Sequence, residues 1–184
     1  MNITIINGIS EDNFANENKS LNKSFNQLKS SNEITQYNVD DLDINNCTGC
    51  WTCWLKDPGK CVFDDDMVNI YKSIVKSDLL VFVSCVKAGF IQSEVKKVID
   101  RMFAVLLPHM TILKGELHHI PRYDNQPKLG LIIVGEEEHD AEQEETLKEF
   151  LYRISLNFNK DKGKFLHYFN INNEKELVNE INNI

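Results

Sequence analysis

Four of the five cysteines of this chain lie in one short segment, CTGCWTCWLKDPGKC, as Cys47, Cys50, Cys53 and Cys61. Two residues separate each of the first three cysteines, and seven residues separate the third from the fourth. Three cysteines at that close spacing are typical of the ferredoxin-type loop, in which thiolates ligate a [4Fe–4S] cluster and a later cysteine completes the set. The wide last spacing and the residue after Cys61, which is not proline, depart from that pattern. The segment therefore predicts, first, a cysteine-ligated iron–sulfur cluster.

Three other interpretations of the same thiols stay open. Zinc also takes four thiolates, but usually from two separated C-x2-C pairs rather than from one tight run, so we rank zinc lower. A pair such as Cys47 with Cys50, or Cys50 with Cys53, is suited to thiol–disulfide exchange. The last interpretation is chemically inert, with reduced thiols in a loop that Trp51 and Trp54 pack against the protein.

Composition and charge limit the class of protein. The chain has 184 residues, close to the size of one domain, and 42% of them are apolar, which is enough for a core without disulfides. Twenty basic residues against 28 acidic ones give a formal net charge of −8, which repels nucleic acids and anionic lipid, so we expect neither partner. The start, MNITIINGIS, does not resemble a signal peptide, and no apolar run is long enough to span a bilayer. We therefore expect a cytoplasmic protein without a membrane partner.

Alternating hydrophobic patterns predict a succession of strands and helices. The run LLVFVS is so evenly apolar that both its faces must be covered, as in a central strand of a parallel sheet. By the same reasoning, the sequence predicts strands at residues 1–7, 33–39, 79–84, 128–134 and 164–171. Apolar residues at helical spacing predict helices at residues 17–30, 66–76, 93–107, 141–158 and 174–184. No flexible linker divides this succession, so we expect one domain over residues 1–184, with a cysteine-rich insertion at 40–66 after the second strand.

This succession predicts a fold and the place of its site. Strands that alternate with helices are joined by right-handed crossovers into a parallel sheet covered on both faces. Five of them predict a three-layer, doubly wound α/β fold with the flavodoxin-like strand order 2-1-3-4-5. Ligands of such sheets bind beyond the carboxyl ends of the strands, where the loops at residues 8–18, 40–65, 85–92 and 135–140 are expected. We therefore expect the cysteines of the second loop to lie beside the ligand crevice.

The order CTGCWTCW, GKCVFDDDM, a helix, LLVFVS, a glycine loop and VKKVIDRM resembles the NAD(P)H-dependent FMN reductases of the flavodoxin-like superfamily. The nearest branch is that of the iron–sulfur flavoproteins, whose cysteines fall at similar spacing. The resemblance covers nearly the whole chain and is most specific between Cys47 and Met102. It implies a flavin-based oxidoreductase that takes hydride from NAD(P)H, passes electrons to a small-molecule or protein acceptor, and needs no catalytic side chain. It also implies a homodimer or a homotetramer.

The resemblance further implies which residues hold FMN. The helix after the first strand would bind the phosphate through its free N–H groups and its positive dipole end, and the loop after the third strand would lie along the flavin ring. The matching residues are Ser10, Asn18 and Ser20 for the phosphate, and Ser84, Val86, Gly89 and Phe90 for the ring. Lys87 is placed to stabilise negative charge on the reduced ring.

Departures from the family pattern keep a second interpretation open. Acidic residues of the first loop, Glu11, Asp12 and Glu17, would repel a phosphate, and Cys85 and Lys87 stand where the family commonly has proline and tyrosine. The alternative is a non-catalytic flavodoxin-like module, for binding or for accepting electrons, with a degenerate FMN site and inert thiols.

Two further motifs receive structural interpretations. Because adjacent residues of an extended segment point to opposite faces, we do not expect His118 and His119 to share a metal ion. The Asp100-Arg101 dipeptide matches the helix signature of the family, and we interpret its charges as ion-paired rather than catalytic.

Overall fold

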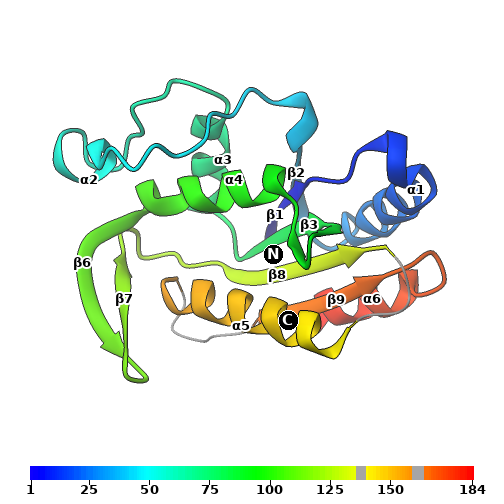
Figure 1. Ribbon diagram of the computed structural model, residues 1–184. Helices are drawn as coiled ribbons and strands as arrows, with labels where there is room; N and C mark the ends of the chain where they lie inside the picture. Colours follow the sequence, from blue (N-terminus) through cyan, green and yellow to red (C-terminus); the bar gives the residue numbers. More distant parts are fainter. Residues whose placement is uncertain (136–139, 159–163) are drawn as a thin grey trace.

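The computed structural model describes residues 1–135, 140–158 and 164–184, and within these residues the chain forms a central five-stranded parallel sheet (Figure 1). The strands of this sheet are β1 (Asn2–Asn7), β2 (Glu33–Asn38), β3 (Leu79–Ser84), β8 (Lys128–Val134) and β9 (Lys164–Phe169). They lie in the order β2-β1-β3-β8-β9, and all four neighbouring pairs are parallel. The predicted α/β fold with flavodoxin-like strand order is confirmed.

The central strand β3 is buried on both faces because its side chains alternate between two hydrophobic layers. Leu80 and Phe82 belong to one core cluster, and Leu79, Val81 and Val83 belong to the other. The first cluster is covered by α3 (Met67–Ile74), α4 (Ser93–Arg101) and α5 (Ala141–Leu156). The second cluster is covered by α1 (Glu11–Leu28) and α6 (Glu174–Asn182). The sheet is thus the middle of three layers, as the even hydrophobicity of LLVFVS predicted.

Helix α1 begins at Glu11, earlier than the predicted start at residue 17. Ser10 precedes it in an extended conformation, which is usual for a residue just before a helix. Phe14 has non-helical angles (φ −139°, ψ 42°), so the helix is kinked after its first turn. Asn18 and Ser20 consequently lie inside the helix rather than in its first turn.

A second difference follows helix α4, which was predicted to reach residue 107 and ends at Arg101. A short 3-10 turn, η2 (Met102–Val105), leads into an antiparallel hairpin of β6 (Leu106–Leu113) and β7 (Glu116–Pro121), which stands out from the body in Figure 1. The two-residue turn at its tip is Lys114-Gly115, with φ of 51° and 85°. Two positive φ values suit the right-handed twist of a tight hairpin, and glycine adopts them without strain. The sequence predicted no strand between residues 107 and 128, so this hairpin was not anticipated.

Four short elements complete the described part of the fold. The loop after β3 closes as a hairpin of β4 (Val86–Lys87) and β5 (Phe90–Ile91) around a turn with positive φ at Ala88 and Gly89. A 3-10 turn, η1 (Val39–Asp41), follows β2, and the four-residue helix α2 (Thr52–Leu55) lies within the cysteine-rich insertion. Of the acidic loop expected at residues 135–140, residues 136–139 lie outside the described part. Its last residue, Asp140, caps α5 by accepting a hydrogen bond from the N–H of Glu142.

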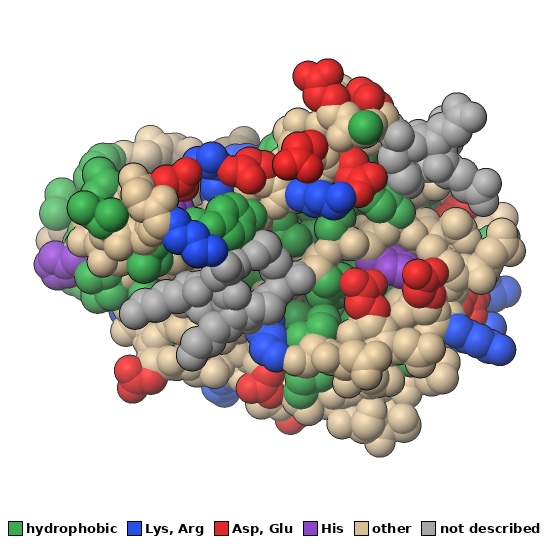
Figure 2. Space-filling view, turned by 90° about the horizontal axis from the view of Figure 1, so that it is seen from below, with side chains coloured by type: hydrophobic (Ala, Val, Ile, Leu, Met, Phe, Trp, Pro, Cys, Tyr) green, Lys and Arg blue, Asp and Glu red, His purple; other side chains and the backbone are tan. Residues whose placement is uncertain are grey.

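The surface is apolar at one end of the molecule. Large exposed apolar side chains include Trp51 and Leu55 of the insertion and Met110, Ile112 and Leu117 of the hairpin. In Figure 2, hydrophobic side chains gather at the end of the molecule that carries the hairpin. Within the described residues, no helix combines the length and the apolar composition needed to cross a bilayer.

Candidate functional site

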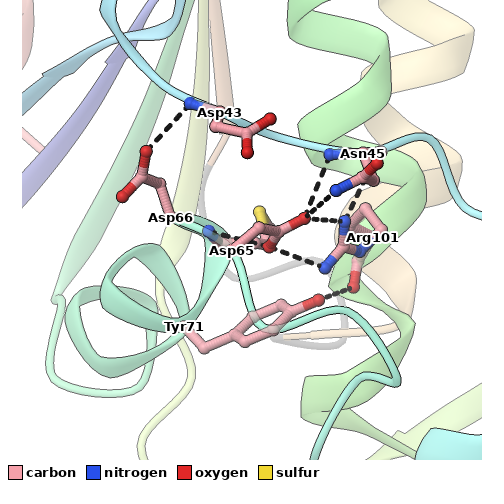
Figure 3. A network of polar contacts seen from close by, with 7 residues as sticks. Asp43, Asn45, Asp65, Asp66, Tyr71 and Arg101 are labelled. Atoms are coloured by element: carbon pink, nitrogen blue, oxygen red, sulfur yellow. Dashed lines mark hydrogen bonds and ion pairs between the residues drawn. The ribbon is translucent and has the colours of Figure 1, made fainter.

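The cysteine-rich insertion is tied at its base by contacts between its two ends. The N–H of Asp66 donates to the carbonyl of Asp43 at 3.1 Å, and the N–H of Asp43 donates to the carboxylate of Asp66 at 2.8 Å. One step further in, Asn45 donates to Asp65 from its backbone N–H at 3.0 Å and from its side chain at 3.2 Å (Figure 3). These contacts hold the insertion as a closed loop, so the cysteines between them are confined to one region.

A buried ion pair then fixes this loop to helix α4. The guanidinium of Arg101 donates two hydrogen bonds to the carboxylate of Asp65, at 2.8 and 3.0 Å, and a third to the carbonyl of Asn45 at 2.7 Å (Figure 3). The side chains of Arg101 and Asp65 are 1% and 2% exposed. The hydroxyl of Tyr71 in α3 donates to the carbonyl of Arg101 at 2.8 Å. The network thus joins the insertion, α3 and α4.

The charges in this network stabilise each other. Burial alone would favour the neutral carboxyl of Asp65, but hydrogen bonds from Arg101 and Asn45 outweigh it and lower the pKa of Asp65 to about 2. The pKa of Tyr71 is raised, first by burial. The ion-pair interpretation of Arg101 is confirmed with a different partner, because Asp100 pairs with Lys96 on the surface of α4.

All four cysteines of the insertion line a single pocket, although Cys47 and Cys50 are exposed and Cys53 and Cys61 are half-buried. The backbone between them winds sharply, with left-handed φ at Gly49 (65°) and Trp51 (60°). Other parts of the chain complete the pocket. They are residues of α3, α4 and η2, namely Tyr71, Arg101, Phe103 and Ala104. The described residues around this pocket include no aspartate or glutamate.

The thiols influence one another electrostatically. Burial is the main cause that raises the pKa of Cys53, and the negative charges of Cys61, Cys47 and Cys50 raise it further. The pKa of the exposed Cys50 is lowered, chiefly by the side-chain hydroxyl of Thr52. The four thiols therefore lie near enough to influence one another electrostatically. In the described part of the chain, however, no three histidine, cysteine or acidic side chains are gathered tightly enough to hold a single metal ion.

The pocket is also anchored to the base of the β6–β7 hairpin. The indole N–H of Trp54 donates to the carbonyls of Phe103 and Leu106, at 3.0 and 3.1 Å. Arg122, just after β7, donates to Leu106 at 3.1 Å and reaches the carbonyl of Cys53 at 3.4 Å. The sequence indicated that Trp54 packs the loop against the protein, but it revealed neither these hydrogen bonds nor the role of Arg122, because their partners are backbone carbonyls that no side-chain motif reveals.

At the carboxyl ends of β1 and β3, a different polar network joins the two loops expected to hold a flavin. Gln92, 4% exposed, donates from its side chain to the carbonyl of Gly8 and accepts a hydrogen bond from the thiol of Cys85 at 2.9 Å. Its backbone N–H donates to the hydroxyl of Ser84 at 3.0 Å, and that hydroxyl donates to the carbonyl of Cys85 at 2.8 Å. The loops after β1 and β3 are therefore held side by side.

The structure separates the residues predicted for FMN into two groups. Ser10 lies at the start of α1 and makes no capping bond with its side chain. Val86, Lys87, Gly89 and Phe90 form the β4–β5 hairpin, where Lys87 and Gly89 are exposed. These residues are carried by the two loops that Gln92 joins.

The other three predicted FMN residues are buried and already bonded within the protein. Asn18 accepts a hydrogen bond from Asn7 at 3.1 Å, and Ser20 donates to Glu174 of α6. Ser84 is fully buried within the Gln92 network.

The thiol pocket does not lie beside these loops, contrary to expectation. Gln92 immediately precedes α4 at the carboxyl ends of β1 and β3, whereas Arg101 and Phe103, at the other end of α4, line the thiol pocket. Figure 1 shows α2 and the hairpin at one end of α4 and the β4–β5 loop at the other. Nine helical residues span about 13 Å at 1.5 Å per residue. The insertion runs back along α4, so its thiols lie near the end of α4 opposite the loops that Gln92 joins (Figure 1).

The two histidines of β7 point apart, as their adjacency predicted. His118 is buried and contacts Glu116 at 3.2 Å, whereas the ring of His119 lies 4.7 Å from that of Trp54.

Comparison of the sequence with known proteins finds relatives among the iron–sulfur flavoproteins. An iron–sulfur flavoprotein of Archaeoglobus fulgidus is 34% identical over 106 residues, which cover 56% of this chain and 46% of that protein. Another, from Methanocaldococcus jannaschii, is 29% identical over 98 residues, 53% of this chain and 49% of that protein. The matched region is thus about half the length of these curated relatives. No protein-family model matches the chain.

Solved structures share the fold over nearly the whole chain. An FMN-dependent NADH-azoreductase of Bacillus anthracis, in complex with FMN, superposes with a TM-score of 0.63 at 14% identity and 98% coverage of both chains. An NAD(P)H:quinone oxidoreductase of Methanothermobacter marburgensis gives a TM-score of 0.63 at 11% identity, covering 96% of this chain and 90% of the other. The resemblance to the flavodoxin-like FMN reductases, nearest to the iron–sulfur flavoproteins, is therefore confirmed as a likeness of fold and of partial sequence.

Proposed function

We propose that this protein is an FMN-dependent NAD(P)H oxidoreductase whose four clustered cysteines ligate a [4Fe–4S] cluster as a second redox centre. One observation carries the proposal: Cys47, Cys50, Cys53 and Cys61 line one pocket of a chain with the fold of FMN reductases. The names of the two sequence relatives support it, since both are iron–sulfur flavoproteins.

The donor set of the pocket suits a cluster better than a zinc ion. Zinc draws four ligands to about 2.3 Å from one centre. A cluster instead spreads its thiolates over several irons, which suits four cysteines distributed around one pocket. Arg101 lines the same pocket, and its Nε–H is buried and has no hydrogen-bond partner among the described residues. A guanidinium in the lining suits a site of thiolates, because a positive charge nearby stabilises their negative charge.

The loops joined by Gln92 fit FMN through their backbone and through part of the predicted residues. Ser10 and the first N–H groups of α1 would hold the phosphate, because a helix N-terminus favours an anion. Val86, Lys87, Gly89 and Phe90 would lie along the flavin ring. Asn18, Ser20 and Ser84 remain predictions, with a positioning role more consistent with their internal hydrogen bonds. When bound, FMN supplies the hydride chemistry with NAD(P)H, and the protein orients its ring.

The apolar end of the molecule supports a homo-oligomer, which we propose to be a homodimer. On the outer face of the hairpin Met110, Ile112 and Leu117 are 50%, 71% and 65% exposed. A two-stranded hairpin is marginally stable in water unless one of its faces is covered, and contiguous apolar patches often mark protein interfaces. Light scattering on the purified protein tests this part of the proposal, and a monomer at micromolar concentration would contradict it.

The experiment that tests the proposed function is a measurement of cofactor content under anaerobic conditions. The visible spectrum, iron and acid-labile sulfide are measured on protein purified without oxygen, and the spectrum is repeated after addition of FMN. We expect bound flavin and about four irons per chain. Cys47→Ser should lose the iron, whereas the matched control Cys85→Ser should keep it, because Cys85 lies outside the pocket and is buried against Gln92.

Each outcome of this measurement decides between named alternatives. Flavin and iron together, with iron lost only in the Cys47 variant, support the proposal. Flavin without iron overturns the cluster and leaves a plain flavin reductase. Neither flavin nor iron, even with excess FMN, overturns the enzyme and leaves the non-catalytic module.

A further inference from the structure

A second cavity lies next to the thiol pocket, and three of its six lining residues are aromatic. It has a volume of about 170 Å³ and is lined by Cys47, Gly49, Trp51, Cys53, Trp54 and Phe103. Both tryptophans of the chain are in this set. The described lining residues include no basic or carboxylate side chain, so the cavity disfavours a charged ligand.

The rings of Trp51 and Phe103 each pack edge-on against the ring of Trp54, and we call these three rings the aromatic frame. The ring of Trp51 lies 5.3 Å from that of Trp54 at an interplanar angle of 85°, and the ring of Phe103 lies 5.5 Å from it, also at 85°. A flat ring that enters this frame can therefore stack on one aromatic face and meet another edge-to-face, which are the preferred aromatic geometries. An aliphatic ligand would gain burial but not these contacts.

The central ring of this frame is held in place before any ligand binds. The indole of Trp54 is fixed by its two hydrogen bonds to the base of the hairpin, and its ring also lies against that of His119 at 4.7 Å. Trp51 and Phe103 remain 57% and 41% exposed, so both present apolar surface that a ligand would cover. Because Trp54 is already fixed, fewer side chains lose conformational freedom when a ligand binds, so the entropic cost of binding is lower.

We infer that this cavity binds a planar, uncharged aromatic molecule of one or two rings, in contact with Cys47 and Cys53. Its size agrees, since an apolar cavity of roughly 150 Å³ is enough to bind benzene in another protein. Cys47 and Cys53 line both this cavity and the thiol pocket, so the ligand would lie against the cysteine site and near the end of α4 opposite the flavin loops. The binding does not depend on the proposed function, and its test does not require flavin or iron.

Intrinsic fluorescence tests this binding directly, because both tryptophans lie on the cavity wall and thus dominate the signal. The probe is tetramethyl-1,4-benzoquinone, which is planar, uncharged and substituted at every ring carbon that a thiol would otherwise attack. It is titrated into the protein as purified, and flavin and iron are measured in the same sample. We expect quenching that saturates with a dissociation constant on the order of 100 µM.

Two wall variants and one matched control locate the site. Phe103→Leu and Trp51→Leu keep apolar volume but remove an aromatic ring, and each should weaken binding about threefold to tenfold. Leu55→Ala is the control, since Leu55 is 76% exposed on the same short helix as Trp54 but does not line the cavity. It should bind the quinone like the unchanged protein. Far-UV circular dichroism checks that each variant is folded, and two independent wall variants keep the test decisive if one is not.

The possible results separate the inference from its rivals. Saturable quenching weakened in a folded wall variant and unchanged in Leu55→Ala supports the inference. Quenching that rises linearly without saturation indicates collisions only and overturns it, as does saturable binding that neither wall variant weakens. Absence of flavin and iron in a sample purified without oxygen, even after addition of excess FMN, would overturn the proposed function alone and leave the binding result standing.

Discussion

Replacement of Asp65 by asparagine is the sharpest test of how the cysteine-rich insertion is held. The carboxylate accepts two hydrogen bonds from Arg101, two from Asn45, and one from the N–H of Met67 at 3.2 Å. Asparagine has nearly the same shape but turns an NH2 group toward these donors. It also leaves the guanidinium of Arg101, whose side chain is 1% exposed, without its counter-charge.

The expected cost of Asp65→Asn at neutral pH is about 3–5 kcal/mol, the range for removing one partner of a buried ion pair. The pH dependence gives a separate figure. The pKa of Asp65 falls from 3.8 to about 2 on folding, which corresponds to about 2.4 kcal/mol at 1.36 kcal/mol per pKa unit. Because the folded-state pKa is the lower one, this stabilisation is present above about pH 4 and is lost as the pH falls toward 2.

The assay is urea unfolding followed by circular dichroism at pH 7 and at pH 3. Asp100→Asn is the matched control, since Asp100 pairs with Lys96 on the surface of the same helix and is 44% exposed. The control should change the free energy of unfolding by less than about 1 kcal/mol. The difference between the unchanged protein and Asp65→Asn should be smaller at pH 3 than at pH 7. A loss below about 1 kcal/mol at pH 7, or a difference that does not shrink in acid, would refute the reasoning.

Two further substitutions test the packing around the sheet and the network. Gly130→Ala places a Cβ 2.2 Å from Cε1 of Phe165 on the adjacent strand, so we expect a loss of about 1–3 kcal/mol, measured as a lower urea midpoint; an unchanged midpoint would show that the ring moves freely. Tyr71→Phe removes the hydroxyl that donates to the carbonyl of Arg101 and should cost about 1–2 kcal/mol in the same assay, and a cost near zero would mean that this hydrogen bond does not stabilise the fold.

The fold itself was predictable because its signals are local. The five consecutive apolar residues of β3 exclude an amphipathic strand, and the alternation of such runs with helical patterns allows few topologies other than a doubly wound parallel sheet. The boundaries were less predictable. The kink at Phe14 and the two positive φ values at Lys114 and Gly115 depend on backbone conformations that a hydrophobic pattern does not encode.

The sequence also determined which thiols belong together, because the spacing of Cys47, Cys50 and Cys53 confines their sulfurs to one loop whatever its surroundings. Only the tertiary structure decided where that loop lies and what surrounds it. Asp65 and Arg101 are 36 residues apart, and their pairing directs the insertion toward the far end of α4, away from the flavin loops. A short window of sequence carries the preferences of neighbouring residues. Many packing contacts and buried polar bonds between elements together determine which distant surfaces meet. These contacts form only in the folded chain.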